Sequence, residues 1–169
     1  VYGGNTTYGG AWTDERLLRV RYEQAAERQF TAQQHAKQPH HHITTSNLLV
    51  HKAVMQTVPF DNRFITYGYE DVFWGMSLAQ KGIQVAHIDN PVGFNYYDNN
   101  VAFVAKTIEA LYTLYAFSTE LADISPIIRL ERRLHRWHLD GLVCKMLNRM
   151  MPMLHRNIVG GKPSLVAFK

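Results

Sequence analysis

Apolar positions recur with helical spacing in four stretches of the chain. The spacing predicts helices over residues 14–34, 70–80, 101–121 and 126–151, and a shorter helix over 51–58. Thr13 stands where it can cap the first helix, and Pro126 stands where it can begin the last. The helix over 70–80 opens with two acids and closes with Lys81-Gly82, an order that suits the helix dipole and the usual glycine exit.

Three short segments are rich in β-branched or apolar residues and predict strands. They are residues 1–4, 43–50 and 83–88, and a further extended piece is expected over 92–95. The Gly- and Thr-rich residues that follow the first strand, up to Gly10, predict a turn. Because strands come early and long helices late, the sequence predicts a mixed α/β fold.

Composition narrows the class of protein. A length of 169 residues suits one domain, and 46% hydrophobic with 19% charged residues gives enough apolar surface for a packed core. Cys144 is the only cysteine, which excludes a disulfide framework, and the spacing of Cys and His residues suggests no structural zinc. The longest apolar runs are far shorter than the ~20 residues needed to span a bilayer.

The formal charge of +4 arises from the C-terminal region. The helix predicted after Pro126 has apolar residues on one face, Leu130, Leu134 and Trp137, and carries arginines at 129, 132, 133 and 136. Such a helix can lie on an anionic membrane surface, bind nucleic acid through phosphates, or present a solvated basic rim to water. No nucleic-acid recognition motif accompanies it, so a basic module at a membrane is the favoured alternative to an enzyme.

Glu70 and Asp71 are adjacent carboxylates at the start of the predicted helix over 70–80. Free amides at a helix N-terminus keep such carboxylates ionised, and an ionised carboxylate can accept a proton from a bound hydroxyl. Their aromatic neighbours offer flat apolar faces of the kind that pack against sugar rings; these are Tyr67, Tyr69, Phe73 and Trp74. On spacing alone, capping and solubility are the commoner explanation of two acids in a first turn.

Four motifs stand in order around these acids. They are Ser46-Asn47-Leu48-Leu49-Val50, Phe60-Asp61-x-x-Phe64, Gly68-Tyr69-Glu70-Asp71-x-x-x-Gly75, and Lys81-Gly82 before a predicted strand. Their order resembles the C-terminal half of family 2 glycosyltransferases, which have the GT-A fold. The segment His87-Ile88-Asp89-Asn90-Pro91-Val92 and the opening Tyr2-Gly3-Gly4 are similar to a bacterial branch of that family. The resemblance implies that residues 1–100 are the C-terminal, acceptor-side half of a GT-A-like catalytic domain, and that residues 101–169 are a helical extension packed on it.

The resemblance also implies a reaction. A sugar would pass from a nucleotide-sugar donor to a hydroxyl of a glycan or lipid-linked acceptor, with inversion, in bacterial cell-envelope polysaccharide biosynthesis. Asp71 would be the general base, and Glu70 would bind the acceptor or orient its loop. The acceptor side would be lined by Asn47, Tyr67, Gly68, Tyr69 and Trp74, with core packing as the alternative for Trp74. The expected location is the cytoplasm, peripheral at the inner face of the plasma membrane, and no nucleic-acid partner is expected.

The chain departs from the family pattern in its metal site. The family commonly uses a divalent metal, Mn²⁺ or Mg²⁺, held by an Asp-x-Asp motif, and this chain contains no such motif. We therefore expect no metal ligand of its own. His87 is the nearest remaining candidate, and a hydrogen-bonded strand histidine is the alternative interpretation. The missing motif predicts a fragment that lacks the nucleotide-binding half and is inactive alone.

Overall fold

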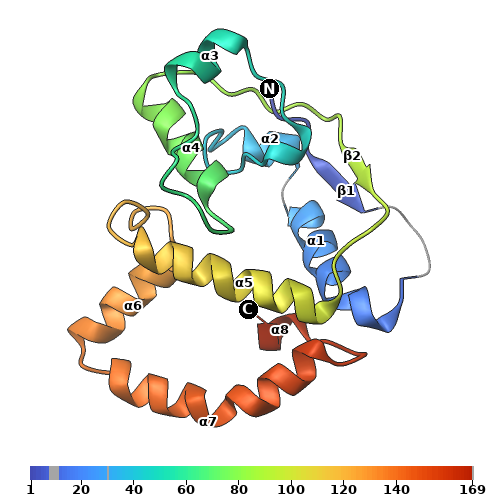
Figure 1. Cartoon of the computed structure of the whole chain (residues 1–169), viewed down its shortest axis with the longest axis vertical. Helices are drawn as coiled ribbons and strands as arrows, with labels where there is room; N and C mark the ends of the chain where they lie inside the picture. Colours follow the sequence, from blue (N-terminus) through green and yellow to red (C-terminus); the bar gives the residue numbers. More distant parts are fainter. Residues whose placement is uncertain (8–11, 30, 169) are drawn as a thin grey trace.

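The β structure of the protein is centred on the first residues of the chain. The computed structural model describes residues 1–7, 12–29 and 31–168. Strand β1 (Asn5–Thr7) pairs in parallel with β2 (Val92–Phe94), and Thr6 lies opposite Gly93. Before β1, Tyr2 forms an antiparallel bridge to Leu48 and a parallel bridge to His87. The N-terminal segment therefore lies between two extended segments that are distant in sequence (Figure 1).

Helices dominate the rest of the described chain, which is mixed α/β as the sequence predicts (Figure 1). The helices are η1 (Asp14–Arg16), α1 (Leu17–Gln29), α2 (Ala32–His35), η2 (Thr45–Asn47), α3 (Lys52–Thr57), α4 (Glu70–Gln80), α5 (Asn100–Ala116), α6 (Pro126–Arg136), α7 (Asp140–Val159) and α8 (Leu165–Phe168). The prediction over 70–80 is confirmed as α4, and Gly82 follows it with φ +66°, the left-handed exit that a glycine allows.

The predicted helix over 14–34 is wrong as one continuous element. A 3-10 turn precedes α1, and Thr13 forms no side-chain cap with it. The structure describes α2 as a separate helix with its own capping box. In that box the Thr31 hydroxyl accepts from the Gln34 N–H, and the Gln34 side chain accepts from the Thr31 N–H. In the turn predicted up to Gly10, Asn5–Thr7 form β1 instead, and residues 8–10 lie outside the described residues.

The strands predicted over 43–50 and 83–88 are reduced to single bridges with Tyr2. In the first segment, polar side chains form local bonds that compete with a strand ladder. Thr44 and Ser46 share a hydroxyl contact of 2.9 Å, and Thr45–Asn47 coil into η2. The second segment is tied to Tyr2 by two backbone bonds, with Ala86 as acceptor and Ile88 as donor.

The single helix predicted over 126–151 is also wrong, because the chain turns between α6 and α7. His138 takes φ 54° in that turn, and the His135 ring lies 3.1 Å from a carboxylate oxygen of Asp140. Helix α5 ends at Ala116 rather than at residue 121. The turn that follows places Leu121, which is fully buried, in the core.

Three apolar clusters hold these elements together. One joins α1, α5 and the end of α7 through Leu18, Phe103, Val104 and Ile158. A second surrounds Ile43, Val58, Trp74 and Leu78, and a third packs Leu114, Leu121, Ala122 and Ile128 against α4. The helices after residue 100 thus pack on the first hundred residues, and the identity of those residues as half of a catalytic domain stays a prediction.

Two further observations complete the architecture. Buried Asn100 ties three segments together, since its Oδ1 accepts from the Leu18 N–H and its Nδ2 donates to the carbonyls of Asp14 and Gly160. Within the residues described, no helix combines the length and apolar content that crossing a membrane requires.

Candidate active site

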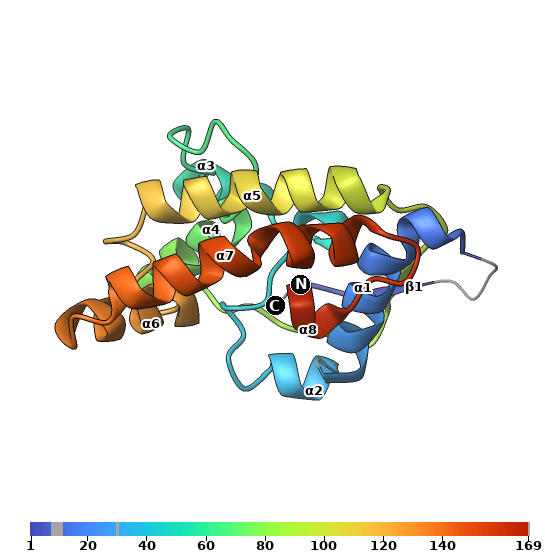
Figure 2. The same cartoon turned by 90° about the horizontal axis from the view of Figure 1, so that it is seen from below.

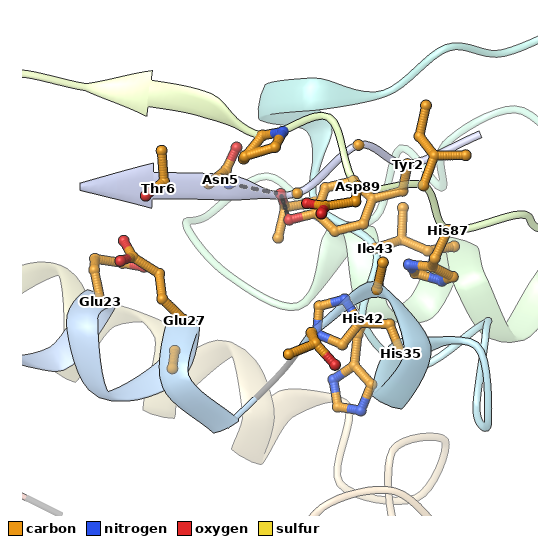
Figure 3. Close-up of a pocket in the computed structure, with 18 of the residues that line it drawn as sticks. Tyr2, Asn5, Thr6, Glu23, Glu27, His35, His42, Ile43, His87 and Asp89 are labelled. Atoms are coloured by element: carbon orange, nitrogen blue, oxygen red, sulfur yellow. Dashed lines mark hydrogen bonds between the residues drawn. The ribbon is translucent and has the colours of Figure 1, made fainter. Parts of the chain in front are cut away.

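A cleft of about 800 Å³ opens beside the N-terminal segment. Its walls come from the residues before and in β1, from α1, from α2 and the histidine-rich turn after it, from the start of α4, and from residues 87–91 (Figure 3). Among its described lining residues are four carboxylates, on Glu23, Glu27, Asp71 and Asp89, and neither a lysine nor an arginine. The cleft is therefore negatively charged.

Asp71 reaches this cleft because of the backbone that precedes α4. Gly68 has φ +103° and Tyr69 has φ 67°, so two successive left-handed residues turn the chain into the helix. Gly68 also lies close to α5, where a Cβ at position 68 would be 2.6 Å from the Cβ of Ala110. This close approach requires glycine, and it fixes Asp71 in the first turn of α4, where its side chain lines the cleft.

Burial sets the protonation of Asp71. Loss of hydration, followed by the negative charge of Glu70, raises the pKa of Asp71 from 3.8 to about 6. Its Oδ1 accepts a hydrogen bond of 2.8 Å from the Val72 N–H. In the described part of the chain, no lysine or arginine forms an ion pair with it. A carboxylate with a pKa near neutrality is ionised at pH 7 and holds a proton better than an ordinary aspartate, as a general base requires.

Glu70 is adjacent in sequence but occupies a different place. It is not among the described residues that line the cleft, and its Oε2 is buried with no hydrogen-bond partner in the described structure. Its effect on the site is electrostatic, through the pKa of Asp71. A direct contact of Glu70 with an acceptor stays a prediction.

Helix α1 supplies two cleft carboxylates that the sequence analysis missed. Glu23 and Glu27 point from α1 toward β1 (Figure 3). The Thr7 hydroxyl donates to Glu27 Oε1 over 2.6 Å and lies 3.0 Å from the Tyr97 hydroxyl. Burial raises the pKa of Glu23 even though Arg19 lies 2.6 Å away. The available signal was their i, i+4 spacing, which puts like charges together on one helix face at a cost in stability.

Histidine and tyrosine rings form the other end of the cleft. The His35 ring stacks on His42 at 4.9 Å between centroids and meets His87 edge-on at 5.2 Å, and Tyr2 lies against both His35 and His87. Burial, together with the two neighbouring imidazoles, lowers the pKa of His35 to about 4. The His35 ring is therefore neutral at pH 7, and the aromatic rings together give this end of the cleft flat surfaces.

The cleft histidines are engaged in a hydrogen bond and in ring contacts with one another. His87 Nε2 donates to the Pro39 carbonyl over 2.8 Å, as the hydrogen-bonded alternative for this residue predicts. Across residues 1–7, 12–29 and 31–168, no three or more His, Cys, Asp or Glu side chains are grouped so that they could hold a metal ion. Whether the protein uses the Mn²⁺ or Mg²⁺ that the family resemblance implies stays a prediction.

The remaining predicted acceptor residues lie apart from the cleft lining. Asn47 Nδ2 donates to the carbonyls of Gly4 and Asn90, so its amide joins the two segments that border the cleft. Tyr69 packs on the cluster around Leu114, while Tyr67 is 43% exposed beside α5. The structure corrects the prediction that Trp74 lines the acceptor side. Trp74 is 2% exposed, its indole N–H donates to the Val58 carbonyl, and its ring stacks on Phe60. It therefore belongs to the core and cannot touch an acceptor.

Comparison of the chain with protein-family models, curated proteins and solved structures gave no match.

Proposed function

We propose that this chain forms the acceptor side of an inverting glycosyltransferase with a GT-A-like fold. The enzyme transfers a sugar from a nucleotide-sugar donor to a hydroxyl of a glycan or lipid-linked acceptor, and Asp71 is its general base. The observation that carries the proposal is the Asp71 carboxylate, which lines the cleft with a pKa raised to about 6.

Asp71 takes the proton of the acceptor hydroxyl as the oxygen of that hydroxyl attacks the anomeric carbon. The bond to the nucleotide diphosphate breaks on the opposite side of that carbon, which inverts the configuration. A positioned base of suitable pKa contributes about 10²–10⁴-fold to such a rate. These steps use only residues of the chain, and none of them is routed through a metal.

The charge of the cleft supports an acceptor rather than a diphosphate as its occupant. The described cleft lining has four carboxylates and no lysine or arginine, so it would repel phosphate. Carboxylate oxygens accept hydrogen bonds from sugar hydroxyls. The ring faces of Tyr2 and of the cleft histidines suit the apolar face of a sugar. The donor diphosphate would then be held by groups other than these lining residues. A non-catalytic basic module, the alternative from the sequence, leaves this acidic cleft unexplained.

The wider setting of the reaction follows the family resemblance and is part of the same proposal. The enzyme would act in the cytoplasm at the inner face of the plasma membrane, in polysaccharide biosynthesis of the bacterial cell envelope.

Saturation-transfer NMR tests the acceptor assignment. Neutral methyl glycosides should give saturable contacts with the chain, and sugar phosphates should give none. Glu27→Gln, which changes a cleft wall without changing Asp71, should weaken those contacts several-fold, while Glu120→Gln, an exposed control outside the cleft lining, should not. Binding of sugar phosphates in preference to neutral glycosides would contradict the acceptor assignment.

A further inference from the structure

Helix α6 leaves an apolar arc uncovered. Ile128 is its one buried residue among those described, whereas Leu130 and Trp137, just after the helix, are 54% and 69% exposed. At 100° per residue, Ile127, Leu130, Leu134 and Trp137 fall within an arc of about 80°, turned away from Ile128. Of the exposed arginines, Arg133 lies about 40° beyond this arc, and Arg129 and Arg136 lie farther round the same side of the helix. Most of the apolar side of this helix is thus exposed rather than buried.

Helix α7 repeats the arrangement on a larger scale. It has twenty residues, and Ile158 is the one buried residue among them. Leu142, Met146, Met150 and Met153 share an arc of about 80°, and all four are exposed, Leu142 by 68% and Met153 by 64%. Beside that arc run three exposed cations, Lys145, Arg149 and Arg156. We refer to the exposed apolar arcs of the two consecutive helices, together with their neighbouring cations, as the α6–α7 face.

The charges on this face are not neutralised within the chain. Residues 126–156 contain seven arginines and lysines against Glu131 and Asp140. In the described structure none of these seven forms an ion pair with a carboxylate. Arg129 and Arg132 donate to the backbone carbonyls of Asp123 and Ser118, which leaves their charge uncompensated. The face therefore combines apolar area with an excess of positive charge.

We propose that the α6–α7 face binds an anionic membrane surface. Apolar arcs of this kind enter the boundary between headgroups and acyl chains, while guanidinium groups bind lipid phosphates. Trp137, in the turn between the two helices, is the residue type that favours that boundary. Helices α6 and α7 lie on the other side of α5 from the strands (Figure 1), and Figure 2 shows both on the near side. Attachment through this face leaves the cleft beside β1 open to solvent.

Two other kinds of partner would match only one of the two features of the α6–α7 face, its positive charge or its apolar area. Nucleic acid would neutralise the arginines, but its interfaces are polar and would leave the exposed leucine and methionine side chains unburied. A second copy would cover the apolar arcs but would bring two uncompensated basic surfaces together, which repel. An anionic lipid surface would both bury the apolar arcs and neutralise the positive charge.

Vesicle sedimentation tests the proposal with the 169-residue chain. Vesicles of phosphatidylcholine alone are compared with vesicles that contain roughly one-third phosphatidylserine, at low and at high salt. We expect at least ~10-fold stronger binding to the anionic vesicles, because each cation near such a leaflet contributes about fivefold. Binding should fade at high salt because surface charges are then screened.

Matched variants separate charge from apolar area. Changing Arg129, Arg132, Arg133 and Arg136 together to Gln should weaken binding by at least ~30-fold, since about fivefold is lost per cation before screening. A control that changes Arg28, Lys37, Lys52 and Lys81 to Gln removes the same charge from other exposed positions and should change binding less than about threefold. The triple variant Leu142→Ser, Met146→Ser and Met153→Ser removes apolar area from α7 and keeps every charge, and it should abolish sedimentation with the vesicles. Circular dichroism melts check that every variant folds.

Several results would overturn the proposal. They are equal binding to both kinds of vesicle, equal loss in the control and in the arginine variant, or no vesicle binding at all. In that last case, dimerisation that the Ser variant abolishes would identify a second copy as the partner, and salt-sensitive binding to an oligonucleotide would identify nucleic acid.

Discussion

The cost of burying the Asp71 charge predicts that Asp71→Asn stabilises the protein at neutral pH. The pKa of Asp71 rises from 3.8 in the unfolded chain to about 6 in the folded one, with burial as the largest cause and Glu70 as the second. Two pK units correspond to about 3 kcal/mol, and partial solvation of the side chain brings the expected gain to about 1–3 kcal/mol. Asparagine has the same shape and keeps an Oδ1 that can accept from the Val72 N–H.

The pH dependence of this gain has a definite sign. Between pH 3.8 and about 6 the folded wild type binds more protons than the unfolded chain, so wild-type stability falls as the pH rises through that window. The asparagine variant lacks this proton. Its advantage should therefore be near zero below pH 3.8 and complete above pH 6.

Urea unfolding at several pH values measures the difference in the free energy of unfolding between the two proteins. Asp89→Asn is the matched control, because Asp89 lines the same cleft but is exposed, and its effect should stay within about 0.5 kcal/mol. A loss of stability in Asp71→Asn at pH 7.5 would refute the reasoning, since it would show that the carboxylate is stabilised by its surroundings rather than desolvated.

Two further predictions concern the frame of the cleft. Gly68→Ala should cost about 2–4 kcal/mol, because a Cβ would meet Ala110 Cβ at 2.6 Å and φ is +103°. Gly141→Ala, where a Cβ meets nothing within 4 Å, should be neutral or slightly stabilising, and equal thermal midpoints for the two variants would contradict this account. Folding lowers the pKa of His35 from 6.5 to about 4, so between these pH values the unfolded chain binds a proton at His35 that the folded chain does not bind. Stability should therefore be lost as the pH falls from 6.5 toward 4, and His35→Gln should flatten that slope in urea titrations; an unchanged slope would contradict the burial of this ring.

Local signals account for the elements that the sequence predicts well. In α4, the acids at the start, the apolar face and the glycine after the end all act within one helix, and its bounds match the prediction. The turn between α6 and α7 carries no such signal, because residues 137–139 contain neither glycine nor proline. His138 adopts φ 54° there, a conformation that is uncommon for a residue other than glycine and that ends the helix without a glycine or proline to mark it.

The strands over 43–50 and 83–88 failed for a related reason. β propensity shows that a segment can be extended, but a ladder also needs a partner in register. Each segment finds that partner only at Tyr2, whose short extended run offers a single bridge to each.

The candidate site likewise contains one residue that local sequence signals predict and others that only the tertiary structure brings in. Asp71 could be predicted because its role depends on neighbours in sequence, Gly68 before it and the helix after it. Glu23 and Glu27 line the same cleft as Asp71 through tertiary structure, since α1 and the start of α4 are distant in sequence, and no local pattern states that proximity. Trp74 was assigned to the acceptor side because aromatic residues stack on sugars and equally fill cores, and its burial decides between the two.

Transfer activity in the protein encoded by the complete reading frame tests the central claim most directly. A panel of nucleotide-sugars and acceptor glycosides, read by mass spectrometry, should yield a transfer product whose rate rises with pH through about 6 as Asp71 ionises. Asp71→Asn should lower turnover by at least ~10²-fold while its thermal midpoint is unchanged or higher, and Glu120→Gln, an exposed residue that is not in the cleft lining, should stay near the wild-type rate. Near-normal turnover in Asp71→Asn would contradict the account.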